Sequence, residues 1–466
     1  MMPLYTIHIG IDDTDSLEKS CTTYLASLIV QFLLEDGAIF LDYPNLIRLN
    51  PNVPWKTRGN GAVALRVMVN DPEFTFQKIL KIVDENSEIE SSNPGIVLLK
   101  TTQIPSRIKM FGELALYQIV KKRQALQLIN EYNGEYEEFG DGRGIIGALA
   151  AIGNTLDGDH TFEFLAYRSI KERSRDRGVD SNSVIFMSRE TYPRTFNNYD
   201  FEVNRVLITP RGPDPVLFGI RGEDPKIVLK AASLIKVSQP IERYMIFRTN
   251  QGTNSHLTHK LDLSRLKPYT SGYVIGYVSQ LPIIGQGGHV YFKIKNEVGE
   301  AWCAVYEPTS RLRKIASLLI VNDLIEVGGG VRRKYAYHPH IINVEYIRVI
   351  KLAAKIIYEN PTCNKCGKRM VSEGKEKGYS CPYCGFKDKM ARKIPKEIPR
   401  SLKLGLYLPP AHSQRHLTKP FQRFGLEKNG FTYHLIKDWF GLMNKPFNFI
   451  NGSFNTSIPL LDIKNT

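Results

Sequence analysis

The sequence contains no run of 18 consecutive apolar residues, so no transmembrane helix is expected. It does not start with a basic stretch followed by a long apolar block, which argues against a signal peptide. Cysteine is scarce, with six residues among 466, and no internal repeat is found. These absences predict a protein of the cytoplasm with no membrane segment, and they argue against a disulfide-bonded secreted domain.

Acidic residues are also fewer than basic residues. The 62 Lys and Arg residues outnumber the 47 Asp and Glu residues, and the net charge is +15. Such an excess favours a polyanionic partner, with nucleic acid first and an anionic membrane surface second. A length of 466 residues, 42% of them hydrophobic, predicts a soluble globular chain of three or four domains.

Periodicity predicts an α+β multidomain architecture. Apolar runs over 4–11 and 61–69 indicate strands, and helical spacing over 21–36 and 74–86 indicates helices, with Ser20 as the N-cap of the first. Strand and helix alternate to about residue 140, so this part is predicted to be an α/β or α+β domain.

Two further units follow. The stretch 204–249 is predicted as strand, strand, helix, strand, the order of half a ferredoxin-like fold. Five short β-rich runs between 272 and 350, with a short helical stretch at 310–320, predict a small barrel of the OB type.

Four of the six cysteines form two Cys-x₂-Cys units fourteen residues apart, namely Cys363 with Cys366 and Cys381 with Cys384. This spacing is a strong signal for a tetrahedral, structural Zn²⁺ site, and two such units argue against a redox dithiol. Lysines and arginines surround the unit, so it is expected to present a phosphate-binding surface suited to RNA. Tyr379, Tyr383 and Phe386 could stack on bases or pack around the metal site.

The stretch IGIDDTDS, residues 9–16, places three carboxylates directly after a predicted strand. Asp12, Asp13 and Asp15 would repel one another, and a divalent cation such as Mg²⁺ would relieve that repulsion. A solvated acidic turn with a helix cap is the alternative. Thr22 and Thr23 fall in the first turn of the next predicted helix, where a hydroxyl could accept a phosphoryl group beside the helix dipole.

Several long motifs, in order along the chain, resemble archaeal tRNA(Ile) 2-agmatinylcytidine synthetases. They are IGIDDTDS with CTTYLA, LIRLNPNVPWKTRGNGAV (46–63), GRGIIGALAAIG (142–153), PVLFGIRGE (215–223), GGHVYFKI (287–294), YEPT (306–309) and the cysteine pairs. Two departures stand out. Lys19 and Ser20 replace the family's Gly-Met, and residues after about 426 have no counterpart.

The resemblance implies a kinase-like ATP-binding domain (1–140), a ferredoxin-like domain (141–255), an OB-fold (265–350) and a zinc ribbon (360–390). The remainder (391–466) is basic, contains proline and is weakly patterned, so we expect a basic C-terminal tail. It implies an ATP-dependent ligase that attaches agmatine to the wobble cytidine of the isoleucine tRNA with a CAU anticodon. The base carbonyl oxygen would be phosphorylated first, and agmatine would then displace phosphate. Thr22 matches the family's autophosphorylated threonine. The basic segment 409–425 would belong to the RNA-binding end.

Site residues follow from the motifs. We expect Asp12, Asp13, Asp15 and Thr22 to be catalytic, with ATP, Mg²⁺ and Zn²⁺ as cofactors. Residues expected to contact the nucleotide are Thr23, Lys56, Arg58, Gly59, Asn60 and Gly61, although the TRGNG stretch could equally form a hairpin turn. Candidates for contact with substrate are Arg221, Glu223 and Asp224, of which the acids could equally cap a helix.

Two other functions are compatible with parts of the sequence. An OB-type barrel with a zinc ribbon also suits a non-catalytic protein that binds single-stranded nucleic acid, which would not turn over ATP. A kinase-like enzyme acting on a small molecule would leave the basic C-terminal half without a role. The aspartate cluster argues against the first alternative.

Overall fold

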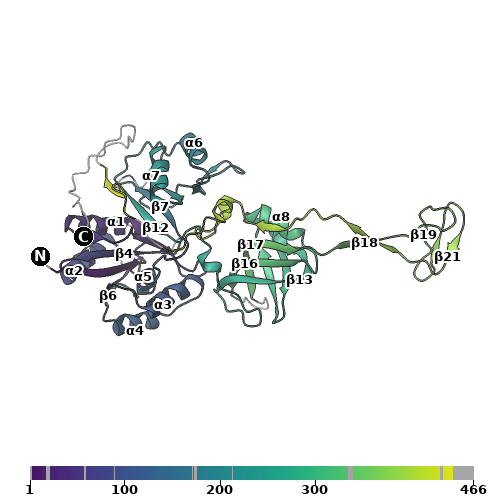
Figure 1. The fold of residues 1–466 in the computed structure, drawn as a ribbon, viewed down its shortest axis with the longest axis horizontal. Coiled ribbons are helices and arrows are strands. Elements are labelled where there is room, and N and C mark those ends of the chain that lie inside the picture. Colours follow the sequence, from purple (N-terminus) through teal and green to yellow (C-terminus); the bar gives the residue numbers. More distant parts are fainter. Residues whose placement is uncertain are drawn as a thin grey trace.

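The computed structural model describes residues 3–16, 21–56, 59–88, 90–169, 172, 176–212, 214–333, 340–430 and 434–443. The protein is an elongated α+β molecule of several parts (Figure 1): a body of sheet and helices, a β-barrel, and a small cysteine-bearing module at the end of a two-stranded stalk. Arg58, Lys19 and Ser20 lie outside the described residues. Within the described ranges, the helices are all too short or too polar to span a lipid bilayer.

The described residues of the body form an 11-stranded sheet of order β6-β5-β1-β4-β3-β12-β7-β11-β8, with β2 added to β4 and β24 added to β12. Its strands are β1 (Tyr5–Asp12), β2 (Ile39–Phe40), β3 (Asn45–Arg48), β4 (Gly61–Val69), β5 (Gly95–Lys100), β6 (Glu135–Glu138), β7 (Thr161–Tyr167), β8 (Thr195–Phe196), β11 (Val216–Gly222), β12 (Arg243–Thr249) and β24 (Phe440–Leu442). The strands expected over 4–11, 61–69 and 243–249 are therefore present. The strand expected over 204–210 is reduced to β10 (Arg205–Val206), which pairs with β9 (Tyr199–Asp200).

A parallel pairing of β3 with β12 joins the two halves of this sheet, with Arg248 opposite Asn45. The Arg248 side chain crosses the junction, and its guanidinium lies 2.7 Å from the carboxylate of Asp42 in a buried ion pair. The regions predicted as an α/β domain and a ferredoxin-like domain thus share one continuous sheet.

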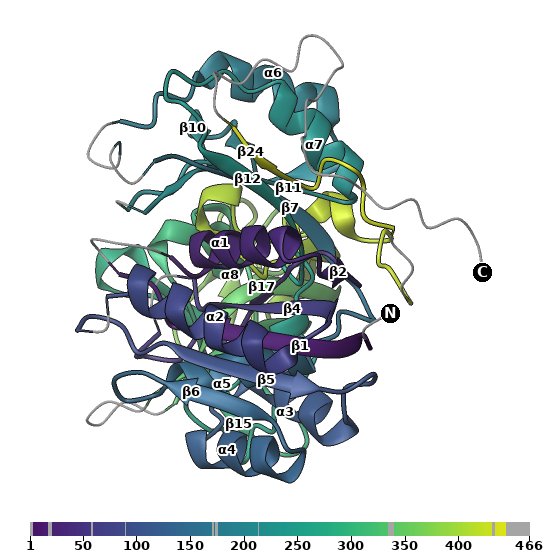
Figure 2. The same cartoon turned by 90° about the vertical axis from the view of Figure 1, so that its left-hand side faces the viewer.

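Helices cover both faces of the sheet, and Figure 2 shows α1 and α2 side by side across β1 and β4. The hydrophobic core on this face also includes α6 and α7, and the core on the other face includes α3, α4 and α5. The helices are α1 (Thr22–Glu35), α2 (Pro72–Asn86), α3 (Ser106–Tyr117), α4 (Lys122–Glu131), α5 (Gly144–Gly153), α6 (Ser181–Thr191) and α7 (Pro225–Ser233). Alternate residues of β4 and β5 serve the two cores, as expected for a sheet buried on both faces.

Helix α5 lies unusually close to β1 and β5. A Cβ added at Gly10 would fall 2.1 Å from the Ala148 oxygen, and one added at Gly95 would fall 2.0 Å from the Ile145 nitrogen. Glycine is therefore required for this contact, because backbone meets backbone without a side chain between them. This packing brings the start of α5 to the end of β1, where the first aspartates lie.

The barrel has five strands in the order β15-β14-β13-β16-β17 and is closed by a parallel pairing of β15 with β17. Its elements are β13 (Ser271–Ile284), β14 (Val290–Lys295), β15 (Glu300–Val305), α8 (Arg311–Ser317), β16 (Leu324–Arg332) and β17 (Ile341–Lys351). The five strands and the short helix match the sequence prediction, since alternation along each run is strict enough to define one buried face.

Beyond the barrel, β18 (Lys355–Glu359) pairs with β22 (Ile394–Ile398) to form the stalk. The stalk carries a three-stranded sheet of β19 (Val371–Ser372), β20 (Tyr379–Ser380) and β21 (Lys387–Asp388) with the four cysteines. Figure 1 shows this module projecting away from the rest of the molecule.

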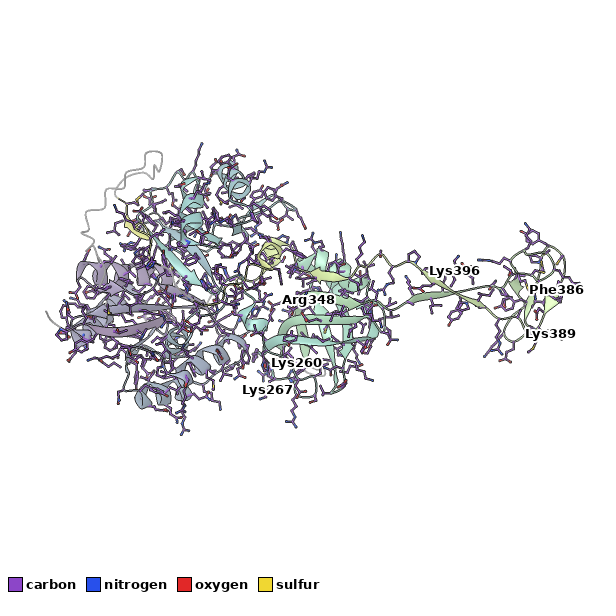
Figure 3. The ribbon with its side chains drawn as sticks, viewed as in Figure 1. Lys260, Lys267, Arg348, Phe386, Lys389 and Lys396 are labelled. Carbon is purple, nitrogen blue, oxygen red and sulfur yellow. The ribbon has the colours of Figure 1, made fainter. Side chains whose placement is uncertain are left out.

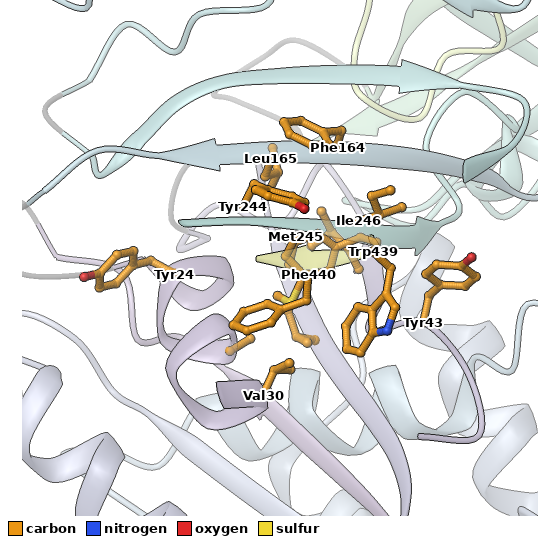
Figure 4. Close-up of a cluster of buried hydrophobic side chains, with 14 of the residues drawn as sticks. Tyr24, Val30, Tyr43, Phe164, Leu165, Tyr244, Met245, Ile246, Trp439 and Phe440 are labelled. Carbon is orange, nitrogen blue, oxygen red and sulfur yellow. The ribbon is translucent and has the colours of Figure 1, made fainter. Parts of the chain in front are cut away.

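The chain after the stalk returns to the body. Strand β23 (Gly405–Tyr407) adds to β17 of the barrel, and β24 adds to β12 of the large sheet. Trp439 packs against Phe40 and Tyr43, at ring-centroid distances of 5.1 and 6.3 Å, and lies with Phe440 in the hydrophobic cluster of Figure 4. The described part of the segment predicted as a basic tail therefore contributes strands to the stalk, the barrel and the body.

Candidate active site

The acidic segment after β1 turns sharply at Asp13, whose φ of 56° lies in the left-handed region. Burial, reinforced by Asp13, raises the pKa of Asp12 to about 8. Burial also raises the pKa of Asp13 to about 6, against the opposing effect of Arg143. The carboxylate of Asp12 lies directly on α5, because a Cβ added at Gly147 would fall 1.8 Å from its Oδ2 atom. Two neighbouring carboxyls that resist ionisation suit a bound cation.

Asp15 takes a different direction, toward the start of α1. Its Oδ1 atom accepts a hydrogen bond from the Thr22 backbone N–H at 2.8 Å and from the Thr22 hydroxyl at 3.2 Å. The Thr14 hydroxyl donates to the Thr22 hydroxyl at 3.2 Å, and both threonines are buried. The N-cap position belongs to Cys21, whose side chain makes no cap hydrogen bond, so Asp15 supplies the capping oxygen that was expected from Ser20.

A cavity of about 680 Å³ opens beside Asp15, Thr22 and Thr23. It lies where β3, β4, β7 and β11 meet the returning C-terminal segment, since residues 411–417 form part of its wall. Six cationic side chains line it, namely Arg48, Lys56, Arg205, Arg211, Arg221 and Arg415, against the carboxylates of Asp15, Glu163 and Asp214. The volume and the excess of positive charge suit an anionic ligand of cofactor size.

The cationic side chains of this cavity destabilise one another's charged forms. Burial lowers the pKa of Arg48, and Arg221 lowers it further. The pKa of Lys56 is lowered by burial and then by Arg415. His416 has a pKa well below its ordinary value, because it is buried beside Arg48, Arg221 and Lys56. A polyanion in the cavity would relieve this crowding, and its binding would be favoured accordingly.

The loop that was expected to contact phosphate lies between two cavities. Lys56 lines both the large cavity and a smaller one of about 90 Å³, which Asp12, Asp13 and Asn60 also line. Gly59 and Gly61 line the large cavity and lie against Arg48, since an added Cβ would fall 2.6 and 2.8 Å from its Nη1 atom. Arg58, named with them, lies outside the described residues. The absence of side chains here makes room for Arg48.

The three substrate-contact candidates have different surroundings. Arg221 lines the large cavity, with its Nε atom 3.1 Å from Glu163 and its Nη2 atom 2.9 Å from His416. Glu223 accepts from Arg423 at 2.6 Å and from Lys428 at 2.6 Å, which commits its carboxylate to a buried ion-pair network. Asp224 caps α7 through the Ile227 N–H at 3.0 Å. Both acids have structural partners, and neither lines the two cavities described above.

Sequence reasoning missed much of the cavity wall. Arg48 and Glu163 lie within buried strands, where no local pattern marks them. The residues His412, Gln414, Arg415 and His416 were assigned to an RNA-binding end, whereas the structure places them beside Thr22.

The four cysteine sulfurs lie within 4.8 Å of one another, with 3.5 Å between Cys363 and Cys384 and 3.4 Å between Cys366 and Cys381. Tetrahedral Zn²⁺–thiolate bonds of about 2.3 Å require sulfurs at roughly 3.8 Å, so the set fits zinc. Gly367 and Gly385 have φ of 70° and 71° and close the two turns of the site. The donor set is complete with four thiolates, so the site is structural.

This set is the one group of three or more candidate ligands within bonding reach of a common ion among the described residues. The three aspartates do not form such a group, because Asp15 is turned toward Thr22 while Asp12 and Asp13 line the smaller cavity. The predicted acidic cluster is therefore divided between two neighbouring cavities.

Comparison with known proteins gives matches over nearly the whole chain. Family models described as the TiaS TCKD domain, the TiaS FLD domain and the TiaS C-terminal zinc ribbon domain match residues 8–140, 142–256 and 360–402. The isoleucine-tRNA 2-agmatinylcytidine synthetase TiaS of Cenarchaeum symbiosum is 42% identical over 420 residues, 90% of this chain and 93% of that protein.

Solved structures agree. The crystal structure of a complex of TiaS with its isoleucine tRNA and ATP superposes with a TM-score of 0.81 at 36% identity, covering 90% of this chain and 97% of that one. A complex of TiaS with the same tRNA, AMPCPP and agmatine gives a TM-score of 0.79 at 34% identity, with the same coverage of both chains.

An α+β body with a cation-lined cavity, joined to a barrel and a zinc-binding module, defines a multidomain enzyme of the ATP-dependent ligase class. Within that class, the chain belongs to the isoleucine-tRNA 2-agmatinylcytidine synthetase family, TiaS.

Proposed function

We propose that this chain attaches agmatine to the wobble cytidine of the AUA-decoding isoleucine tRNA, using ATP. The observation that carries the proposal is the 680 Å³ cavity, which joins the Thr22 hydroxyl to a wall of cations in a chain of this family. The relatives it matches include complexes with an isoleucine tRNA, ATP and agmatine.

ATP is assigned to the large cavity. Its phosphates would pair with the cations whose pKa values are lowered by burial and by one another, above all Arg48 and Lys56. Thr23 and the glycines 59 and 61 line the same cavity and complete the nucleotide contacts. Arg58 and Asn60 are kept as contacts from the same loop. Charge that develops on a transferring phosphoryl group would be stabilised by cations already in place.

Mg²⁺ fits the acidic end of this site. Mg²⁺ in nucleotide-binding proteins commonly uses one or two carboxylates together with phosphate oxygens, so a full protein cage is not needed. Asp12 and Asp13 would hold it, because their raised pKa values reflect buried carboxyls that a cation would stabilise in the ionised form. The ion would neutralise charge on the phosphates.

Thr22 is assigned as a phosphoryl acceptor, with Asp15 as its base. The hydroxyl lies 3.2 Å from the Asp15 carboxylate, within reach for proton transfer. Phosphorylation of the cytidine carbonyl oxygen would turn a poor leaving group into a good one, and the amine of agmatine would then displace phosphate. The proton of the amine must be lost before attack, because its ordinary pKa is roughly 10.4.

Agmatine also carries a guanidinium, which pairs best with a carboxylate. Glu163 and Asp214 line the large cavity together with Asp15, and they pair with Arg221 and Arg177, respectively. Glu223 and Asp224 line neither of the two cavities, and their carboxylates have structural partners. We therefore assign the guanidinium to the cavity acids, keep Arg221 as a substrate contact, and give Glu223 and Asp224 a structural role.

The barrel, stalk and cysteine module are assigned to tRNA binding. Figure 3 shows basic side chains along their length, including Lys260, Lys267, Arg348, Lys389 and Lys396. Tyr383 is 73% exposed and suits base stacking, whereas Tyr379 and Phe386 pack on the cysteine core. We take residues 1–140 as a kinase-like domain, 141–255 as ferredoxin-like, 265–350 as an OB-fold and 360–390 as the ribbon. The family-model matches to 8–140 and 142–256 support the first two limits, and the closed five-stranded barrel supports the third. The zinc-ribbon model begins at 360 and runs on to 402, so it supports the start of the ribbon.

The test is incorporation of radiolabelled agmatine into an isoleucine tRNA transcript with a CAU anticodon, with and without ATP. We expect label in the tRNA only when ATP is present. No label from an enzyme shown to bind both ATP and the transcript would reject the proposed reaction.

Asp15→Asn tests the assigned base. The amide keeps an oxygen to cap α1 but cannot take a proton, so labelling should fall by about 10²–10⁴-fold while tRNA affinity stays unchanged. Asp71→Asn is the matched control, because Asp71 caps α2 through the Phe74 N–H at 3.0 Å in the same way. Equal activity of the two variants would show that Asp15 serves only as a cap.

A further inference from the structure

A buried ion-pair chain connects the barrel to the wall of the large cavity. Arg415 lines the cavity, and its Nε atom lies 3.1 Å from a carboxylate oxygen of Glu345 on β17. The other carboxylate oxygen of Glu345 lies 2.9 Å from Nε2 of His256. Arg415 also donates from Nη1 to the backbone oxygen of Pro51 at 3.2 Å, so its guanidinium is held from two sides.

The three members come from distant parts of the sequence. His256 and Glu345 are shielded from water, whereas the Arg415 side chain is 28% exposed at the cavity. His256 lies in the 3₁₀ turn Ser255–Leu257 between body and barrel and is fully buried, and the Glu345 side chain is 7% exposed. Leu257, Tyr346 and Leu408 form a small hydrophobic cluster beside them. A charge pair in such surroundings is strong and well oriented, and loss of one partner leaves the other without compensation.

Charge at the cavity indicates what Arg415 binds. Arg415 and Lys56 both line the cavity, where cations outnumber acids, and Arg415 lowers the pKa of Lys56. A guanidinium fixed in orientation binds phosphate oxygens in a bidentate manner, and a fixed orientation reduces the entropy lost on binding.

We infer that Glu345 is a positioning residue, which holds the guanidinium of Arg415 at the cavity wall so that Arg415 binds phosphate groups there. The phosphate comes from ATP or from the tRNA backbone, and the inference rests on the proposed function only for the identity of those two ligands. Because Glu345 belongs to β17, the barrel helps to build the phosphate site in addition to binding RNA. The barrel must then be correctly placed against the body for phosphate groups to bind at the cavity wall.

Glu345→Gln tests this role in the full-length enzyme. Equilibrium dissociation constants for ATP and for the tRNA transcript are measured separately. We expect the constant for one of them to rise about tenfold, because the amide removes the negative charge that pairs with the Arg415 guanidinium and fixes its position. A rise for ATP identifies the nucleotide phosphate, and a rise for tRNA identifies the RNA phosphate. No change for either ligand would overturn the inference.

A double-mutant cycle shows whether Glu345 acts through Arg415. Arg415→Ala should weaken the same ligand at least as much, and adding Glu345→Gln to it should produce little further change. Additive losses would mean that Glu345 acts by another route and would overturn the positioning role.

Asp323→Asn controls for simple loss of stability. Asp323 is a buried carboxylate of the barrel that pairs with Arg400, at 2.8 Å, in the segment after the ribbon, but it lines none of the cavities described here. Both variants should lower the unfolding temperature, and only Glu345→Gln should raise a dissociation constant. If both variants raised the dissociation constant equally, the effect of Glu345→Gln would be explained by lower protein stability alone, and the positioning role would be overturned. Failure of the wild-type enzyme to ligate agmatine would reject the proposed function and leave these binding tests intact.

Discussion

The Asp15 carboxylate accepts hydrogen bonds from both the backbone N–H and the hydroxyl of Thr22. Because these bonds turn Asp15 toward α1, the three aspartates do not act as one metal cluster. The Asp15 carboxylate stabilises the first turn of α1 and lies beside the acceptor hydroxyl at the same time. Asp12 and Asp13 face the smaller cavity and keep raised pKa values. Adjacent acids thus acquire different chemistry from the directions of their side chains, as expected when burial and hydrogen bonding set the pKa.

Acid sensitivity is predicted for His8 on β1. Arg66 can only donate, so Nδ1 of His8 accepts from it at 3.2 Å, and Nε2 donates to the Thr101 oxygen at 3.0 Å. Burial and Arg66 lower the pKa of His8 to about 4 from 6.5. The unfolded chain therefore binds more protons between these values, and the free energy of unfolding falls as pH drops from 6.5 to 4.

His8→Gln should reduce that fall, measured by urea unfolding at several pH values. The exposed His434 gives the control substitution, His434→Gln, which should leave the profile unchanged. A profile unaffected by His8→Gln would mean that other groups, such as His160 with its pKa lowered to about 4, account for the acid response.

At the scale of elements, α5 packs tightly on β1 and β5, and this packing places the carboxylate of Asp12 against Gly147. Gly147→Ala would place a methyl group 1.8 Å from the present position of Asp12 Oδ2. Overpacking of this kind costs about 1–3 kcal/mol and forces the carboxyl aside. We expect agmatine labelling to fall at least tenfold, with a lower unfolding temperature. Gly158→Ala is the matched control, because nothing lies within 4 Å of a Cβ added there, and its activity should be unchanged.

The local spacing of apolar residues was sufficient to predict the strands and helices that bury one regular face. Strands over 4–11 and 61–69 and the helix over 21–36 appear within one or two residues of their expected limits, since alternation and helical spacing are set by the core itself. The parallel pairing of β3 with β12 could not be foreseen, because it joins residues 203 positions apart without a local signature. Gly144 and Gly147 lie within α5, where close contact with β5 and with Asp12 leaves no room for a side chain, a requirement that no local pattern shows.

The residues of the candidate site also fall into two groups, those that the sequence could predict and those that it could not. Asp12, Asp13, Asp15 and Thr22 lie in one short motif, so their proximity could be predicted from the sequence alone. Arg48, Glu163 and Arg415 come from three separate segments that only the tertiary fold brings to one cavity. Charge composition indicated an anionic partner but could not show that the chain beyond the ribbon supplies part of the wall.

The β24 segment is predicted to be essential for the stability of the body. Trp439 is buried against Phe40 and Tyr43, and Trp439→Ala should lower the free energy of unfolding by about 3–5 kcal/mol. Denaturant unfolding measures the change. Phe421→Ala removes an aromatic that is 60% exposed in the same returning segment, and it should cost far less. Equal losses would show that β24 is not a structural part of the sheet.

At the scale of the whole molecule, the chain after the stalk returns to the body, and this determines how tRNA binding by the cysteine module can be tested separately from ATP binding in the body. Removal of residues from 361 to the end would delete the ribbon together with Arg415, Arg423 and Trp439, so lost activity would have no single meaning. The stalk offers a cleaner cut, because Glu359 and Ile394 are paired directly across β18 and β22. Replacing residues 360–393 with an Asn-Gly turn closes the stalk as a hairpin and leaves the body intact.

This internal deletion should weaken tRNA binding and leave ATP binding unchanged. The removed module carries Lys365, Lys368, Arg369, Lys375, Lys377, Lys387 and Lys389 and projects away from the cavity (Figures 1 and 3). Each RNA phosphate that the shortened protein no longer neutralises should reduce the slope of log affinity against log salt by about 0.7–0.9, so the dissociation constant and its salt dependence are measured together. Weaker binding with an unchanged slope would mean that the module shapes the RNA path without touching phosphates. Unchanged affinity would assign tRNA recognition to the barrel and body, and loss of ATP binding would show that the module also supports the cavity.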